Sequence, residues 1–307
     1  ANDETMALVA GTRKYKLLYI AIIGGVMDFL GAIILGENVA KTIGKGIPAP
    51  GITISYEKIL ILAVAMATWL TIASLRGFPI STTHSAVGAT MGLLLFVYGI
   101  TGVNWYKILE ILTTWIVSPV VGFVSTYLLC KLVHRTVELK HKGLVEKVAF
   151  QKKFIVPLLI AGALSSFARG ANDSSNACGI LYAAESSINP LFVRALTGFA
   201  MCIGVIAIGR KVIANVGTKV VELLPSAAFI AQINAAVLEL LFAYLGIPLS
   251  ATHMTVMALV GAGVASKSRI NVKTLKSIAY SWGITFPAGA LFAVVTYVLV
   301  SMFVVIP

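Results

Sequence analysis

The sequence predicts an all-α, polytopic membrane protein of two related halves, in which some helices are broken or re-entrant within the membrane. Three observations predict this fold: long apolar segments, a low content of charged residues, and short motifs that occur twice in the same order. Of the 307 residues, 58% are hydrophobic and 12% are charged, and the mean hydropathy is +0.94. A soluble domain of this length carries more charge and less continuous apolar sequence.

The apolar segments are long enough to cross a lipid bilayer as helices. Residues 277–307 contain no charged side chain, and about 20 such residues are enough for one crossing. Residues 59–75 are also uncharged, whereas residues 17–35 and 108–130 carry one charge each. A β-barrel is disfavoured because these runs are continuous rather than alternating. We therefore expect a multi-pass protein of the cell membrane.

The net charge of +12 is better explained by membrane topology than by nucleic-acid binding. Lys and Arg accumulate in the short cytoplasmic loops of membrane proteins, whatever those proteins bind. The richest basic stretch is residues 131–153, and smaller clusters occur at residues 13–16 and 267–276. We expect the first of these in the cytoplasm and regard the other two as candidates for the same side.

Two motifs are repeated at nearly equal separation. Ala-Asn-Asp occurs at residues 1–3 and 171–173, and Pro-x-Ser-x-Thr-His occurs at residues 79–84 and 248–253. Between the motifs, the glycine-containing segment that begins at Gly31 resembles the one that begins at Gly204. After the second motif, Trp115 and Pro119 are echoed by Trp282 and Pro287. Four coincidences in one order indicate a duplicated unit.

The repeat divides the chain into residues 1–134, a basic cytoplasmic connector at 135–153, and residues 154–307. A duplication of this length in an apolar chain is typical of secondary transporters, whose sites lie between the two halves. An apolar stretch precedes the second Ala-Asn-Asp but not the first, which begins at residue 1. We therefore expect a helix of the first half to be missing before Ala1.

The Asn-Asp pairs, Asn2 with Asp3 and Asn172 with Asp173, are candidate cation ligands. One interpretation makes them helix N-caps, since both residue types cap well. The other places them at a break inside the membrane, where a carboxylate is costly and is by default a functional candidate. Their duplication in register with the second motif favours cation binding.

The second motif predicts a helix that begins inside the membrane. Proline suits the entry to a helix, and the Ser or Thr beside it can cap the first turn. The first N–H groups of a helix have no internal partner, and its dipole makes that end positive. Two such ends, carrying Ser81 and Thr83 or Ser250 and Thr252, are expected to bind one oxyanion without a buried Arg or Lys. Ordinary capping and helix–helix hydrogen bonding is the alternative.

The histidines that end these motifs, His84 and His253, have two interpretations. Each could contact the anion directly. Alternatively, each could bond to the backbone and hold the break in place. Metal ligation is disfavoured because no second His or Cys lies at ligand spacing.

Other polar residues interrupt the apolar segments. Asp28 lies in the middle of a 19-residue apolar run and is a candidate substrate-binding residue, while Met201 occupies the equivalent position in the second half. Gln232, Asn234 and Glu239 precede the second Pro-x-Ser-x-Thr-His motif. They could line a cavity or join helices.

Over essentially its whole length, the chain resembles the inorganic phosphate transporter (PiT) family. The resemblance rests on residues 170–177 (GANDSSNA), 79–84, 248–253 and the segment GRKVI at 209–213. It implies two inverted repeats, a homodimer as a possible assembly, and phosphate transport coupled to Na⁺ or H⁺ without a cofactor. The resemblance also implies a functional carboxylate at Asp28.

The resemblance assigns roles residue by residue. It implies Na⁺ binding at Asn2, Asp3, Asn172 and Asp173. It implies phosphate binding at Ser81, Thr82, Thr83, Ser250 and Thr252. Two positions depart from the family pattern: Met6 stands where the second copy has Asn176, and Gln232 stands where some members have Glu.

Three rival functions compete with this interpretation. A sulfate permease could use the same scaffold, although phosphate alone can donate a proton to an acceptor such as Asp28 near neutral pH. A non-transporting phosphate sensor or receptor would bind the anion without accumulating it. An enzyme is the weakest option, because the sequence has no nucleophile–base pairing, nucleotide-binding loop or metal cluster.

Overall fold

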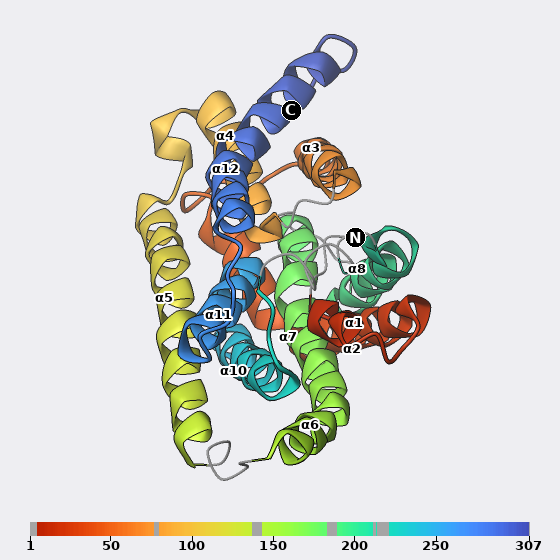
Figure 1. Cartoon of the computed structure of the whole chain (residues 1–307). Coiled ribbons are helices and arrows are strands. Elements are labelled where there is room, and N and C mark those ends of the chain that lie inside the picture. The colour runs from red at the N-terminus through yellow and green to blue at the C-terminus, as the bar shows by residue number, and fades with distance from the viewer. Residues whose placement is uncertain are drawn as a thin grey trace.

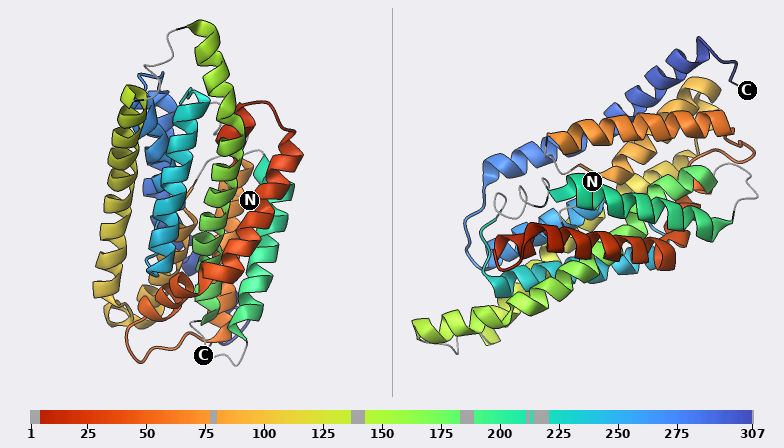
Figure 2. Two further views of the ribbon diagram at one scale, coloured as in Figure 1. Left: turned by 90° about the horizontal axis from the view of Figure 1, so that it is seen from below. Right: turned by 90° about the vertical axis from the view of Figure 1, so that its right-hand side faces the viewer.

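Long helices that run roughly side by side make up most of the protein in this computed structural model (Figures 1 and 2). The structure describes residues 5–76, 80–136, 143–182, 189–210, 213 and 221–306. The helices of the first half and the connector are α1 (Ala7–Gly11), α2 (Leu17–Gly46), α3 (Tyr56–Leu75), α4 (Thr82–Tyr98), η1 (Ile100–Gly102), α5 (Trp105–Thr136) and α6 (Leu144–Lys153). Those that follow are α7 (Ile155–Tyr182), α8 (Pro190–Gly204), the π-helix η3 (Val205–Gly209), α10 (Pro225–Tyr244), α11 (Ala251–Ala265) and α12 (Val272–Ser301).

Within the described residues, seven helical segments are long and apolar enough to cross a membrane. These segments contain α2, α3, α5, α6 with α7, α8 with η3, α10 and α12. Each has at least 18 residues, which suits a hydrocarbon core about 30 Å thick. The expectation of a multi-pass, all-α membrane protein is confirmed.

The helices α4 and α11 are shorter and begin at the repeated Pro-x-Ser-x-Thr-His motifs. α4 has 17 residues and α11 has 15, so at 1.5 Å per residue they span about 25 and 22 Å. Ser81 and Ser250 are their N-caps. The predicted helix starts at these two motifs are confirmed, and both helices are too short to cross the hydrocarbon core alone.

The second Asn-Asp pair lies inside a continuous helix, so the expectation of a break or an N-cap at Asn172 and Asp173 was wrong. α7 runs without interruption through both residues. Two polar side chains around this pair find partners within the helix itself. The Ser174 hydroxyl donates to the carbonyl of Gly170 at 2.6 Å, and Asp173 accepts a bond from a side chain one turn earlier.

All three basic clusters lie toward one end of the helix bundle. One hydrophobic cluster contains Tyr15 and Leu17 at the start of α2, Val133 near the end of α5, and Ile270 before α12. These residues neighbour the basic stretches at 13–16, 131–135 and 267–276 in sequence. A second cluster at the opposite end contains residues from the other ends of the same helices, including Ile43 of α2 and Ile108 of α5.

Glycines let the helix backbones approach closely at three crossings. A Cβ on Gly31 of α2 would lie 1.9 Å from the carbonyl oxygen of Phe167 in α7. Gly92 of α4 meets Ala290 of α12, and Gly261 of α11 meets the backbone of Phe123 in α5. Each short helix therefore packs against a long helix of the other half, as Figure 1 shows for α4 beside α12 and α11 beside α5.

Substitution of Gly31 by Ala should destabilise the protein, because the added methyl group has no room at the α2–α7 crossing. We expect a loss of about 1–3 kcal/mol in the free energy of unfolding, measured by thermal unfolding in detergent. Gly283→Ala in α12 is the matched control, since a Cβ there meets nothing within 4 Å. Equal transition temperatures for the two variants would contradict this packing.

Candidate functional site

The N-termini of α4 and α11 meet, and reciprocal hydrogen bonds join them. The Thr83 hydroxyl donates to the carbonyl of Leu249 at 2.9 Å, and the Thr252 hydroxyl donates to the carbonyl of Ile80 at 3.4 Å. The two threonines are repeat equivalents, and so are the two carbonyl residues. The structure therefore brings together the two predicted halves of the anion site.

Each short helix is capped by the serine of its motif. The Ser81 hydroxyl accepts a bond from the amide of His84 at 3.1 Å, and the Ser250 hydroxyl accepts one from His253 at 3.3 Å. The Ser81 carbonyl accepts the first intrahelical bond of α4 from Ser85. The amides of Thr82 and Thr83 precede this bond and have no acceptor within their own helix. The capping interpretation of Ser81 and Ser250 thus holds, and it leaves amide donors at both helix ends.

The second Asn-Asp pair lies directly beside these helix ends. The Asn172 side chain donates to the carbonyl of Leu249 at 2.8 Å and accepts a bond from its amide at 3.4 Å. The Asn172 side-chain NH₂ group also donates to Asp173 Oδ1 at 3.3 Å. Both side chains are buried, and the structure brings this predicted cation motif into contact with the predicted anion motif.

A buried arginine also lies at this site, so the expectation of a site without a buried Arg or Lys was wrong. The Arg169 guanidinium donates through Nε to Asp173 at 2.9 Å and through Nη2 to the Thr252 hydroxyl at 3.4 Å. The side chains of the ion pair are only 1% and 5% exposed. The sequence signal was available: Arg169 is a charged residue in an apolar segment, and such residues are functional candidates.

Asn176 connects the second Asn-Asp segment to the first short helix. Its side-chain amide donates to the hydroxyls of Thr82 and Thr83, both at 3.3 Å. Asn176 is 2% exposed, and its buried Oδ1 has no hydrogen-bond partner among the described residues. The site is thus built from both halves, with Thr82 at its half-buried edge.

The two motif histidines and the two repeated tryptophans form a row of ring contacts, here called the ring stack, in which Trp115 and His84 are stacked and the other two pairs are tilted. The ring centroids lie 3.6 Å apart for Trp115 and His84, 4.6 Å for His84 and His253, and 3.8 Å for His253 and Trp282. His84 Nδ1 also lies 2.6 Å from the Ser81 hydroxyl. These contacts favour the structural interpretation, in which the histidines hold the two breaks together. The sequence repeat identified Trp115 and Trp282 but assigned them no role.

Asp28 lies on α2 where that helix packs against α7 and α8. It is fully buried, and its backbone touches α7 so closely that a Cβ on Gly170 would lie 2.0 Å from its carbonyl oxygen. One turn earlier on α2, Gly25 faces Cys202 of α8. Asp28 is therefore close to the Asn172–Asp173 segment, and its role as a substrate-binding residue stays a prediction.

The three polar residues of α10 behave differently from one another. Asn234 donates to Ser125 and Thr126 of α5, both at 2.8 Å, and Glu239 accepts a bond from Thr255 of α11 at 3.0 Å. These two residues join helices. Gln232 is 1% exposed, and neither end of its side-chain amide has a hydrogen-bond partner within the described part of the chain.

Asn2 and Asp3 of the first motif copy lie outside the described residues. The chain that follows them packs against α7: the hydroxyls of Thr5 and Ser166 are 2.5 Å apart. Ser166 lies three residues before Arg169. The segment after the first copy thus runs beside the helix that carries the second copy.

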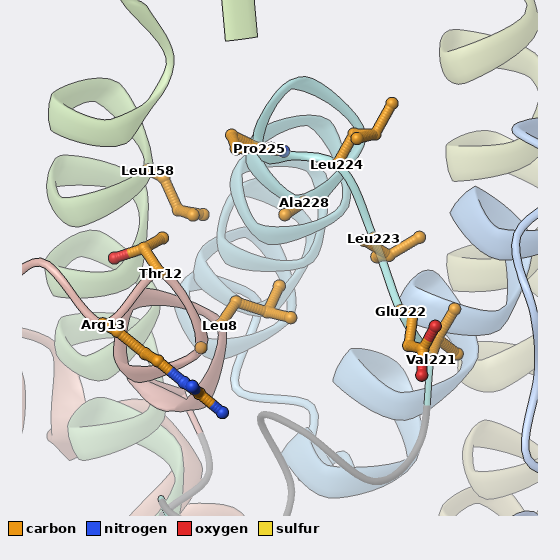
Figure 3. Close-up of a pocket in the computed structure, with 11 residues that line it drawn as sticks. Leu8, Thr12, Arg13, Leu158, Val221, Glu222, Leu223, Leu224, Pro225 and Ala228 are labelled. Atoms are coloured by element: carbon orange, nitrogen blue, oxygen red, sulfur yellow. The ribbon is translucent and has the colours of Figure 1, made fainter. Parts of the chain in front are cut away.

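A pocket of about 590 Å³ lies at the basic end, between α1, α7, α10 and the segment before α10. Figure 3 shows Arg13 and Glu222 on different elements around it. The remaining lining residues are mainly apolar, including Leu8 and Leu158. None of the predicted site residues is among those that line this pocket, so it is separate from the site at the helix ends.

Comparison with known proteins identifies consistent relatives over the whole chain. A family model described as the phosphate transporter family matches residues 1–293. The chain is 29% identical to a proposed phosphate permease of Pyrococcus furiosus, over 95% of this chain and 90% of that protein. It is 26% identical to the chloroplastic inorganic phosphate transporter 2-1 of Arabidopsis thaliana, over 96% and 68% respectively. A solved structure described as the sodium-dependent phosphate transporter superposes with a TM-score of 0.87, at 28% identity, over 99% of this chain and 95% of that one.

The ring stack predicts different effects for two substitutions of His84. His84→Phe keeps an aromatic ring between Trp115 and His253, whereas His84→Ala removes it and leaves a cavity. We expect His84→Ala to lose about 2 kcal/mol or more of unfolding free energy and His84→Phe to lose clearly less. Thermal unfolding in detergent and binding of radiolabelled phosphate measure the two properties. If His84→Phe is stable but binds no phosphate, the imidazole contacts the anion directly.

Proposed function

Because this chain belongs to the phosphate transporter family, we propose that it carries inorganic phosphate across the membrane together with Na⁺. We also propose that its anion site lies where the N-termini of α4 and α11 meet. The family consists of transporters rather than enzymes. The observation that carries the site assignment is the pair of reciprocal bonds, Thr83 to Leu249 and Thr252 to Ile80. They bring the positive ends of two helix dipoles to one place.

Phosphate binding requires several donors that converge on a tetrahedral anion. The free amides at the first turns of α4 and α11 supply them, and the hydroxyls of Thr82, Thr83 and Thr252 can turn from their present partners to the anion. Ser81 and Ser250 cap these first turns and therefore lie at the same helix ends as the amide donors. Such neutral donors bind an anion in a low-dielectric site and still allow its release.

Cation binding is proposed at the Asn-Asp pairs. Asp173 supplies a buried carboxylate, and Asn172 connects it to the backbone of Leu249, which precedes the α11 cap. A cation at Asp173 therefore acts on the segment that shapes the anion site. Asn2 and Asp3 are proposed as the equivalent pair of the first half, and Asp28 as an acceptor near the anion.

The directions of the two short helices support inverted repeats and alternating access. α4 runs from the site toward the cluster that contains Leu93 and Leu94, whereas α11 runs toward the opposite cluster, which contains Leu259. Equivalent helices that point in opposite directions fit two halves inserted with opposite topology. The gathering of the basic clusters at one end supports a cytoplasmic location for that end. A homodimer remains a prediction.

Phosphate uptake into proteoliposomes tests this function directly. With an inward Na⁺ gradient we expect phosphate to accumulate above its equilibrium level, and a pH gradient imposed separately shows whether H⁺ can replace Na⁺. Unlabelled sulfate should compete poorly with labelled phosphate. Saturable binding without accumulation would instead indicate a sensor, and effective competition by sulfate would indicate a sulfate permease.

Removal of the Asp173 carboxylate should abolish coupled uptake, and it should also lower the free energy of unfolding because Arg169 loses its buried partner. Asp173→Asn keeps the size of the side chain but removes the charge that we propose holds the cation. The expected result is a loss of at least about tenfold in Na⁺-driven uptake. Glu110→Gln, which removes an acid paired with Lys107 away from the site, is the matched control and should transport normally. Normal Na⁺-driven uptake by Asp173→Asn would contradict the assignment.

A further inference from the structure

The Arg169–Asp173 ion pair lies between the two proposed binding sites. Asp173 belongs to the proposed cation site, whereas the Thr252 hydroxyl, 3.4 Å from Arg169 Nη2, belongs to the first turn of α11 in the proposed anion site. The same guanidinium thus contacts both through different nitrogens. Its fork geometry allows it to bind a carboxylate and an oxyanion with directed bonds.

We propose that Arg169 is a phosphate-binding residue that couples the two substrates by exchanging partners. In the unloaded protein, Arg169 compensates the charge of Asp173. When Na⁺ binds at Asp173, the cation takes over that compensation, and the guanidinium turns toward phosphate at the end of α11. This inference rests on the proposed function and adds a specific route by which one substrate controls the affinity for the other.

Burial is the reason that the exchange must be concerted. The two side chains are 1% and 5% exposed, and an uncompensated charge at such a depth is strongly destabilising. Na⁺ alone would draw Asp173 away from Arg169, and phosphate alone would compete with Asp173 for the same guanidinium. Binding of both together keeps each buried charge paired. The affinities for Na⁺ and phosphate are therefore linked, and by thermodynamic necessity the linkage is reciprocal.

The exchange also accounts for an arginine in a site that must release its anion. A guanidinium committed to phosphate would slow release, but here Asp173 competes for the same group. Loss of Na⁺ on the inner side returns Asp173 to Arg169. Phosphate then loses its charged partner and leaves.

The test measures the binding of labelled phosphate and labelled Na⁺ to purified protein in lipid nanodiscs at pH 8. For the wild type we expect Na⁺ to raise phosphate affinity by about 5- to 150-fold, the usual range for coupled sites. In Arg169→Gln, phosphate affinity in Na⁺ should fall about tenfold or more. Na⁺ affinity without phosphate should rise, and the effect of Na⁺ on phosphate affinity should shrink to less than about twofold.

Arg194→Gln is the matched control. Arg194 is also a largely buried arginine, which pairs with Glu37 at 3.1 Å and donates to the carbonyl of Ile33, both on α2, and within the described part of the chain it makes no bond to the first turns of α4 and α11. Its removal should leave the Na⁺–phosphate linkage unchanged. Arg169→Lys covers the case in which Arg169→Gln does not fold: it keeps the charge beside Asp173 but loses the reach to Thr252. In that variant Na⁺ affinity should hold and phosphate affinity should fall.

The outcomes separate this inference from the proposed function. If the wild type binds phosphate with no dependence on Na⁺, the proposed Na⁺ coupling fails, and the role of Arg169 fails with it. If the wild type shows the linkage and Arg169→Gln retains it, the inference alone is overturned. A folded Arg169→Gln protein with reduced thermal stability but unchanged linkage also overturns the inference alone, because the ion pair would then serve only to stabilise α7.

Discussion

The meeting of two helix N-termini inside a membrane protein is the constraint on which the rest of the structure depends. Each end carries amide groups without internal acceptors, and a low-dielectric surrounding makes unsatisfied groups costly. Serine caps satisfy one amide on each side, and the threonine hydroxyls cross to the carbonyls of the opposite break. The His–Trp stack and the glycine contacts hold the two turns in this position.

Charge compensation at the site follows from the same constraint. The segment of α7 beside the helix ends contains an acid, a base and two amides, and all of them are buried. Because Asp173 pairs with Arg169 one turn earlier on the same helix, the helix stays intact where a break was expected. The site therefore combines two short helices with a continuous helix that carries a buried ion pair.

Local sequence signals predicted some of this arrangement and not the rest. The apolar runs gave the transmembrane helices, and the Pro-x-Ser-x-Thr-His motifs placed the starts of α4 and α11 at Thr82 and Ala251, because capping and helix dipoles act within one turn. The hydrogen bond from Thr83 to Leu249 could not be predicted, since it joins residues 166 positions apart. The contacts of Arg169 were not predicted because they depend on the helical phase of α7 and on the approach of α11.

The most direct test of the central claim is a structure of the protein with arsenate, a phosphate analogue whose arsenic atom is located by anomalous scattering. Our account predicts one strong arsenic peak between the first turns of α4 and α11, within hydrogen-bonding distance of their amide groups. An arsenic peak at the separate pocket of the basic end, or first turns that lie apart and face water on different sides, would contradict it.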